Sequence, residues 1–186
     1  MGGGDVPDQG LRYELAAVLG APILLAPLAR AHPAARIVAL TAPELALLPV
    51  TADIADVITP VLDPGALPGG TAAAAERRAA LLTGPESGFA VLRAGLAALI
   101  EAASAGGVLA YVEAEYVGRE GVQAAAVWRR GHLAIGPLLL GRREEFVADN
   151  APVNVALRAL GVVAAGRSDE FAVAGLGRHR RTADWS

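Results

Sequence analysis

The sequence contains no cysteine and no lysine, and each absence excludes a class of function. Without cysteine there is no disulfide, no thiolate nucleophile and no cysteine-type zinc site. Because all 16 basic residues are arginine, the chain also lacks the lysine of a Schiff base and of a Walker-type phosphate loop. Candidate functional groups are therefore carboxylates, arginines and the few histidine and aromatic side chains.

Aromatic residues are scarce, at 4%, although 54% of the residues are hydrophobic, because alanine supplies much of the apolar count. A chain of this length, 186 residues, is close to the size of one domain and can bury roughly 70% of its unfolded surface. It therefore needs no metal or disulfide to hold a core. The alanine-, arginine-, glycine- and proline-rich usage is typical of proteins from high-GC bacteria.

The net charge of −3 argues against general nucleic-acid binding. The N-terminus lacks the basic start and apolar core of a secretory signal. Glycine and proline interrupt the long apolar stretch at residues 16–28, which is shorter than the ~20 residues of a membrane span. We therefore expect a cytoplasmic protein without nucleic-acid or membrane partners.

Glycine and proline mark the organisation of the chain. We expect a disordered tail at 1–10 and one domain at 11–186, with a flexible linker at 59–70 that is rich in both residues. In the first part, patterning predicts strands at 11–19, 36–40 and 44–50, and helices at 22–30, 51–58, 71–84 and 85–104. The last helix is the clearest, because its apolar residues from Phe89 to Ile100 recur at spacings of three and four.

The hydrophobic period changes to two after Val108, which is typical of half-buried strands. Turn signals divide this region into strands from Val108, at 122–128 and at 132–135. A helix that Asn150 and Pro152 start and Gly161 closes follows, and then a short turn at 168–171. The sequence therefore predicts an α+β fold in which an antiparallel β-meander at 108–136 packs against the Phe89–Ile100 helix.

Polar side chains gather on the first two meander strands and their turn. Glu113 and Glu115 lie two residues apart, so both project from one face of the sheet. Such a pair could bind a cation, split into acid and base roles, or simply be a solvated face whose charge Arg119 neutralises. The candidate binding residues in this region are Glu113, Glu115, Arg119, Glu120 and Gln123.

A second candidate group lies near the C-terminus and comprises Arg178, His179, Arg180, Arg181 and Trp185. Arginine clusters can hold phosphate or carboxylate groups. The favoured alternative is an internal clasp, in which these arginines pair with Asp169, Glu170 or Asp184. For Trp185 we favour docking on its own domain over contact with a partner.

No familiar catalytic or metal-binding motif is present. The three histidines, His32, His132 and His179, match no metal-ligand spacing, and no serine lies in a nucleophile-elbow frame. The pair Gly175 and Gly177 lacks the third glycine of a dinucleotide-binding turn. We therefore expect no metal and no cofactor, and the question of catalysis stays open, with the balance against an enzyme.

Two segments carry a resemblance. They are Ala-Tyr-Val-Glu-Ala-Glu-Tyr-Val-Gly-Arg-Glu-Gly-Val-Gln-Ala-Ala-Ala-Val-Trp at 110–128, and Asp-Glu-Phe with Gly-Leu-Gly-Arg-His-Arg-Arg-Thr-Ala-Asp-Trp within 169–185. Together they resemble small proteins of high-GC bacteria, some of them toxin-immunity-like or interaction proteins, with no established activity. The resemblance implies an interaction role and transfers no catalytic residue. This chain departs from the pattern at Arg119, where a glycine is expected.

Two functions follow as hypotheses. The first is a non-enzymatic protein-binding domain, for example an immunity-like neutraliser of a basic toxin, that engages its partner through the glutamate-bearing sheet face. The alternative is a small-ligand or anion-binding domain, or an enzyme, with one pocket between the meander turn and the C-terminal arginines. The alternative requires these two regions to converge. The oligomeric state is left open.

Overall fold

A computed structural model describes residues 12–57, 81–118, 120–166 and 168–185. The expected tail at 1–10 and the expected linker at 59–70 lie outside these ranges. The centre of the described fold is an antiparallel sheet with the strand order β2-β3-β1-β4-β5-β6. The strands are β1 (Arg12–Gly20), β2 (Val38–Ala39), β3 (Ala46–Pro49), β4 (Val108–Val117), β5 (Glu120–Arg129) and β6 (His132–Leu140). The predicted α+β class and the meander β4-β5-β6 are confirmed.

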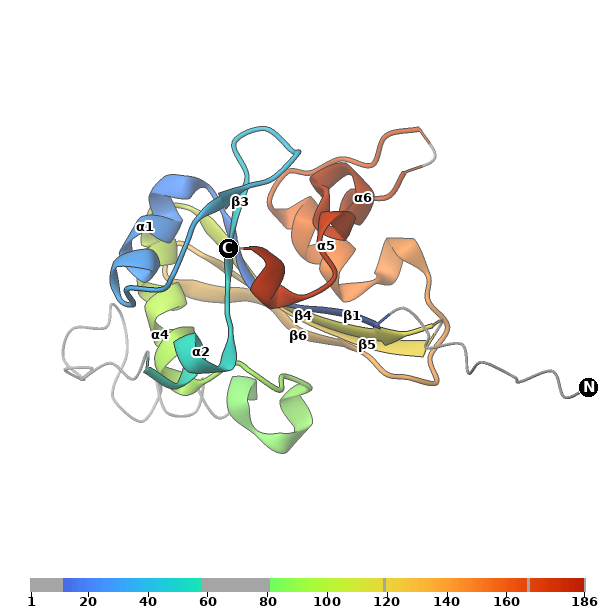
Figure 1. The fold of residues 1–186 in the computed structure, drawn as a ribbon, viewed down its shortest axis with the longest axis horizontal. Coiled ribbons are helices and arrows are strands. Elements are labelled where there is room, and N and C mark those ends of the chain that lie inside the picture. Colours follow the sequence, from blue (N-terminus) through green and yellow to red (C-terminus); the bar gives the residue numbers. More distant parts are fainter. Residues whose placement is uncertain (1–11, 58–80, 119, 167, 186) are drawn as a thin grey trace, which may run out of the picture.

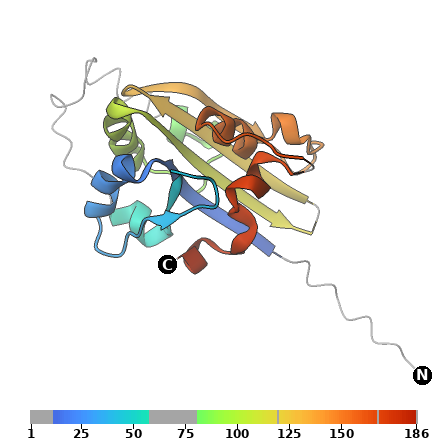
Figure 2. The same cartoon turned by 90° about the horizontal axis from the view of Figure 1, so that it is seen from above.

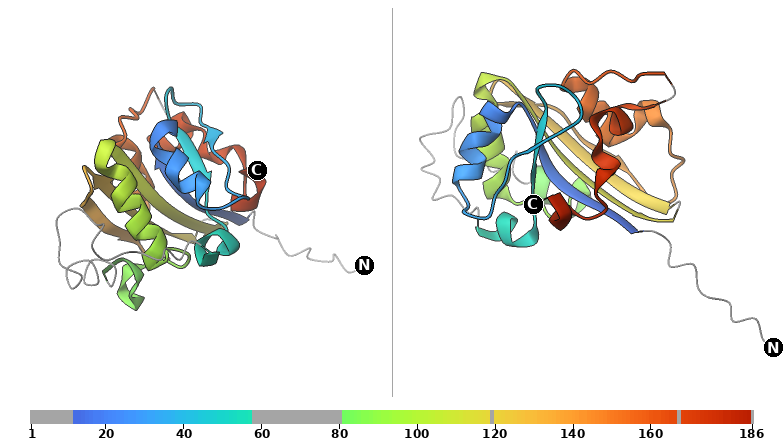
Figure 3. Two further views of the ribbon diagram at one scale, coloured as in Figure 1. Left: turned by 90° about the vertical axis from the view of Figure 1, so that its left-hand side faces the viewer. Right: turned by 45° about the horizontal axis from the view of Figure 1, so that its top comes forward.

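Helices cover both faces of this sheet (Figure 1). One face packs against α1 (Pro22–Arg30), α2 (Ala52–Val57) and α4 (Ala94–Ala103), and the view in Figure 3 shows α4 lying across it. The other face packs against α5 (Pro152–Ala159) and α6 (Glu170–Ala174). Short 3₁₀ turns complete the described chain: η1 (Pro85–Ser87), η2 (Ser104–Gly106), η3 (Ala148–Asn150), η4 (Leu176–Arg178) and η5 (Thr182–Trp185).

Alternation along the strands produces two apolar clusters, one on each face. On the α4 side, Val18, Tyr111 and Trp128 are fully buried. On the α5 side, Leu19 and Val112 are fully buried in the other cluster. The meander therefore packs on the predicted α4 helix and, in addition, on a second helical layer. Within the described ranges no helix combines the length and the apolar character needed to cross a bilayer.

The helix expected over 85–104 is shorter than predicted. Pro85–Ser87 forms a 3₁₀ turn, and α4 begins only at Ala94. Gly88 adopts a positive φ of 71° between them, a conformation that favours glycine and interrupts a right-handed helix. The apolar spacing from Phe89 onward was compatible with a helix, but the backbone N–H groups at 90–92 bind the side chain of Glu113 instead.

Two other elements extend beyond their predicted ends. The strand expected at 132–135 continues to Leu140, because register shifts on β6 accommodate Gly136 and Pro137 within the ladder. The turn expected at 168–171 becomes the helix α6. Asp169 caps it by accepting a hydrogen bond from the N–H of Ala172 (3.0 Å).

The C-terminal strap, residues 178–185, runs beside the first half of β1 (Figure 2). There β3 does not pair with β1, since the β1–β3 ladder begins at Ala17. The N–H of Glu14 donates to the carbonyl oxygen of Arg180 (2.8 Å), and the N–H of Ala16 donates to the hydroxyl of Thr182 (2.9 Å). The strap thereby satisfies backbone groups that would otherwise lie at an open edge.

Candidate functional site

A pocket of about 490 Å³ lies on the α4-facing side of the sheet, toward the start of β1. Its floor comes from β1, β4 and β5. Its walls are the start of α2, the loop at 88–91 and the C-terminal strap. The side chains that decide its chemistry are Arg12, Glu14, Thr51, Asp53, Glu113, Glu115 and Thr182.

The floor combines apolar and charged groups in register. Ala16 pairs with Glu113, and Glu113 pairs with Ala124, so these three lie side by side across the strands. One step outward along the same face, Glu14 pairs with Glu115. The pocket therefore has small apolar side chains near the helices and carboxylates toward its outer end.

Glu113 is buried, with 8% of its surface exposed, and all its hydrogen bonds are internal. The backbone N–H of Ala90 donates to Oε2 (2.7 Å), and those of Val91 and Leu92 donate to Oε1 (2.9 Å each). The hydroxyl of Tyr111 also donates to Oε1 (2.8 Å). The prediction that Glu113 and Glu115 share one face is confirmed. The carboxylate of Glu113, however, is not exposed on the surface but accepts hydrogen bonds from the protein's own backbone.

Burial and the adjacent Glu113 carboxylate raise the pKa of Tyr111 well above its ordinary value. Burial and the negative charge of ionised Tyr116 raise the pKa of Tyr13, whose hydroxyl donates to the carbonyl of Leu176 (3.1 Å). Burial also raises the pKa of Tyr116. Each tyrosine is thus held in its protonated, hydrogen-bonding form.

Glu115 and Glu14 are the half-exposed carboxylates at the outer end of the pocket. Arg12 lies 3.3 Å from Glu14 and 3.5 Å from Glu115, and Arg142 lies 3.8 Å from Glu115. Pairs of this exposure contribute about 0–1 kcal/mol and rearrange readily. The structure pairs these acids with Arg12 and Arg142, whereas the sequence interpretation named Arg119, which lies outside the described residues.

The remaining meander candidates do not join this pair. Glu120 is exposed at the start of β5. The side chain of Gln123 is directed to the α5 side, where its Oε1 accepts from the N–H of Val153 (3.0 Å) and its Nε2 donates to the hydroxyl of Tyr116 (2.7 Å). Gln123 therefore supports a helix start on the opposite face of the sheet.

The C-terminal candidates are organised around Trp185, which is buried with 1% exposure. The His179 ring contacts the indole edge-to-face at 4.6 Å, and the Arg178 guanidinium lies 5.1 Å from the ring centre. Arg178 also donates to the carbonyl of Ala39 (2.8 Å). The predicted docking of Trp185 on its own domain is confirmed.

Two of the three expected acid partners of the C-terminal arginines, Asp169 and Glu170, are engaged elsewhere. Glu170 pairs with Arg158 (3.0 Å), and Asp169 caps α6 while accepting from Asn154 (3.1 Å). Among the described residues no ion pair joins Arg178, Arg180 or Arg181 to a carboxylate. The predicted clasp is therefore wrong: Glu170 pairs with Arg158 on α5, and Arg178 contacts the carbonyl of Ala39 and the Trp185 ring instead.

The strap reaches the pocket through Thr182 and Ala183, whereas the residues at 178–181 are absent from the described lining. The histidines are dispersed as well: His32 accepts from the N–H of Ala34, and His132 begins β6. Within the described ranges no three histidine or carboxylate side chains gather as metal ligands do.

Five of these pocket side chains are not among the site candidates from the sequence: Arg12, Glu14, Thr51, Asp53 and Thr182. Glu14 faces Glu115 only because β1 pairs with β4, which lies far along the chain. Asp53 lies in the first turn of the helix predicted at 51–58, but its position beside the sheet depends on packing. No local signal brings Thr182 to the β1 edge.

Comparison with protein-family models, with curated proteins and with solved structures finds no match to this chain.

Proposed function

We propose that this protein is a protein-binding domain whose pocket accepts a basic side chain of its partner. The observation that supports it most directly is the charge of the pocket. Its described lining carries four carboxylates, Glu14, Asp53, Glu113 and Glu115, against one guanidinium, that of Arg12. An immunity-like neutraliser of a basic toxin is one concrete form of this function.

The shape of the pocket supports the same ligand chemistry. An arginine or lysine side chain has an aliphatic stem and a cationic head. The stem would lie on the small apolar residues Ala16 and Ala124, and the head would reach Glu14 and Glu115 at the outer end. The guanidinium of Arg12 already lies within 3.5 Å of both carboxylates, so their spacing accommodates a planar cation.

The pocket volume also falls in the range of small-molecule sites, which supports a second candidate function. A free cationic metabolite with an apolar body would use the same carboxylates. This candidate does not require the C-terminal arginines, which distinguishes it from the anion-binding hypothesis.

The test is a pull-down from native lysate with the double variant Glu14→Gln/Glu115→Gln, which keeps the shape and removes both outer charges. We expect the wild type to retain a stoichiometric partner with a basic surface and the variant to bind it at least ~10-fold more weakly in titration calorimetry. Glu113 is left intact, because its substitution would disturb the fold.

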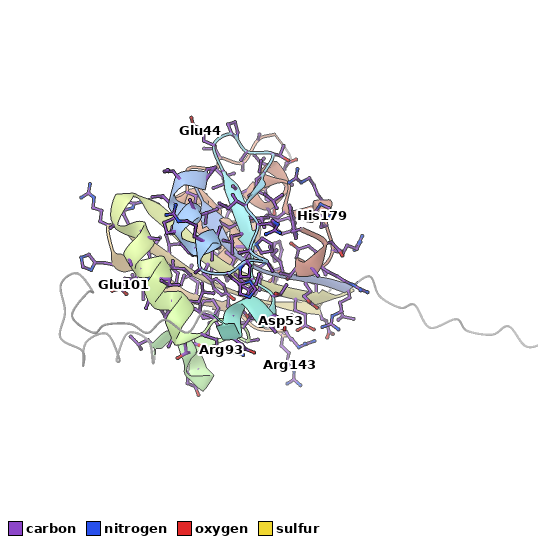
Figure 4. The ribbon with its side chains drawn as sticks, turned by 60° about the vertical axis from the view of Figure 1, so that its left-hand side comes forward. Glu44, Asp53, Arg93, Glu101, Arg143 and His179 are labelled. Carbon is purple, nitrogen blue, oxygen red and sulfur yellow. The ribbon has the colours of Figure 1, made fainter. Side chains whose placement is uncertain are left out.

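The matched control is Glu44→Gln/Asp149→Asn, which removes two exposed charges outside the pocket; Figure 4 shows Glu44 at the tip of a turn far from Asp53. The control should bind as the wild type does. Equal retention of the partner by all three proteins would contradict the pocket as the docking site. Retention of no partner by the wild type would favour the small-ligand candidate.

A further inference from the structure

The loop at 90–92 presents three consecutive backbone N–H groups to a single carboxylate. Their distances to the oxygens of Glu113 are 2.7, 2.9 and 2.9 Å. Successive N–H groups that converge in this way form a concave site of the kind that binds anions. Here the protein fills the site with a side chain of its own, from the middle of β4.

The opposite side of the loop is held by a cation. The guanidinium of Arg93 donates to the carbonyl oxygens of Ala90 (3.0 Å) and Val91 (3.1 Å), and its Nε lies 3.4 Å from Asp56 on α2. Figure 4 shows Arg93 near α2. The N–H groups and the carbonyl groups of one short segment are thus fixed by side chains of opposite charge.

This segment is irregular, so no ladder or helix supplies these hydrogen bonds. Leu92 is buried with 2% exposure and packs in the same core as Leu96 and Ile100. Loss of the carboxylate would leave buried N–H groups without acceptors, which is more costly than the loss of an exposed contact. Glu113 therefore connects β4 to the start of α4.

The same segment forms a wall of the pocket, because Gly88, Ala90 and Val91 line it. We propose that Glu113 is a positioning residue: it acts as a built-in anion that holds the loop at 88–92 in place and so shapes the pocket wall. The effect on partner binding rests on the proposed function. The position of the loop does not, and it can be tested without a partner.

The test uses Glu113→Ala, which removes a CH₂–COO⁻ group equivalent to acetate. In hydrogen exchange we expect the amides of Ala90, Val91 and Leu92 to exchange about 10- to 100-fold faster than in the wild type. Acetate should then restore their protection and raise the melting temperature of the variant, whereas chloride at equal ionic strength should not. The wild type should not respond to acetate.

A second variant keeps the proposal testable if Glu113→Ala does not fold. Glu113→Gln retains the size and one acceptor oxygen but turns an NH₂ group toward an N–H donor, so these amides should exchange at intermediate rates. Wild-type protection of the three amides in the variant that folds would overturn the proposal. An equal rise in the melting temperature of Glu113→Ala with acetate and with chloride would also overturn it. Neither outcome depends on whether a partner binds the pocket.

Discussion

Polar strand residues in this protein act as remote caps for segments that cannot cap themselves. The residues preceding α1, α4 and α5 are Ala21, Arg93 and Ala151, and none makes a side-chain capping hydrogen bond. Gln123 supplies an acceptor to the first turn of α5, at the N–H of Val153, and Glu113 binds the N–H groups at 90–92 just before α4. Their spacing on strands made them look like one surface site, although one serves each face of the sheet.

Gln123 provides a residue-scale prediction. Gln123→Ala should lower the free energy of unfolding by about 1–2 kcal/mol, because it removes the acceptor for the Val153 N–H and the donor to Tyr116. Urea unfolding measures this difference. The control is Glu120→Gln on the same strand, which is exposed and should stay within about 0.5 kcal/mol of the wild type. Equal unfolding midpoints for Gln123→Ala and wild type would contradict the capping role.

At the scale of elements, local patterns identified the meander and most helices because these depend on periodicity and on proline and glycine positions. Pro22 and Pro152 mark the first residues of α1 and α5, as predicted. Local patterns failed at 88–93, where a side chain of β4 determines the backbone. They also could not place β1 between β3 and β4, since that pairing joins distant segments.

The C-terminal strap is an element defined only by its tertiary contacts. The carbonyl of Arg180 and the hydroxyl of Thr182 accept hydrogen bonds from β1. Trp185 anchors the end of the strap in the apolar cluster on the α5 side. Because its 3₁₀ turns are short, the strap depends on this anchor. Since Thr182 also lines the pocket, the anchor contributes to the second pocket wall.

Trp185→Ala should therefore lower the free energy of unfolding by about 3–5 kcal/mol, as expected for a fully buried tryptophan. The amides of Glu14 and Ala16 should lose protection in hydrogen exchange, because the strap supplies their acceptors. Trp185→Phe retains an aromatic anchor and should lose less stability. If Trp185→Ala kept the wild-type unfolding midpoint and protected amides, the strap would not depend on its anchor.

At the scale of the molecule, both sheet edges are protected against pairing with other chains. The edge strand β2 has two residues, and β6 carries Pro137 and two register shifts toward β5. Helical layers cover the two faces. Within the described residues, the pocket is thus a recess beside a sheet whose edge strands are short or irregular, which favours recognition by side chains over recognition by strand addition.

The three tyrosines give a prediction for the whole molecule, because the fold raises the pKa of each above its ordinary value of 10.0. Folding thus favours protonated tyrosine. Stability should stay constant with respect to these groups below pH 10.0 and should fall as the pH rises above it, since the unfolded chain then ionises first. In an alkaline titration, tyrosinate absorbance should appear together with loss of circular dichroism.

Tyr111→Phe should reduce the alkaline dependence of stability, because this phenol is buried beside Glu113. Ionisation of all three tyrosines near pH 10.0, with the circular dichroism unchanged, would show that the hydroxyls are not held as the hydrogen bonds of Tyr13 and Tyr111 require.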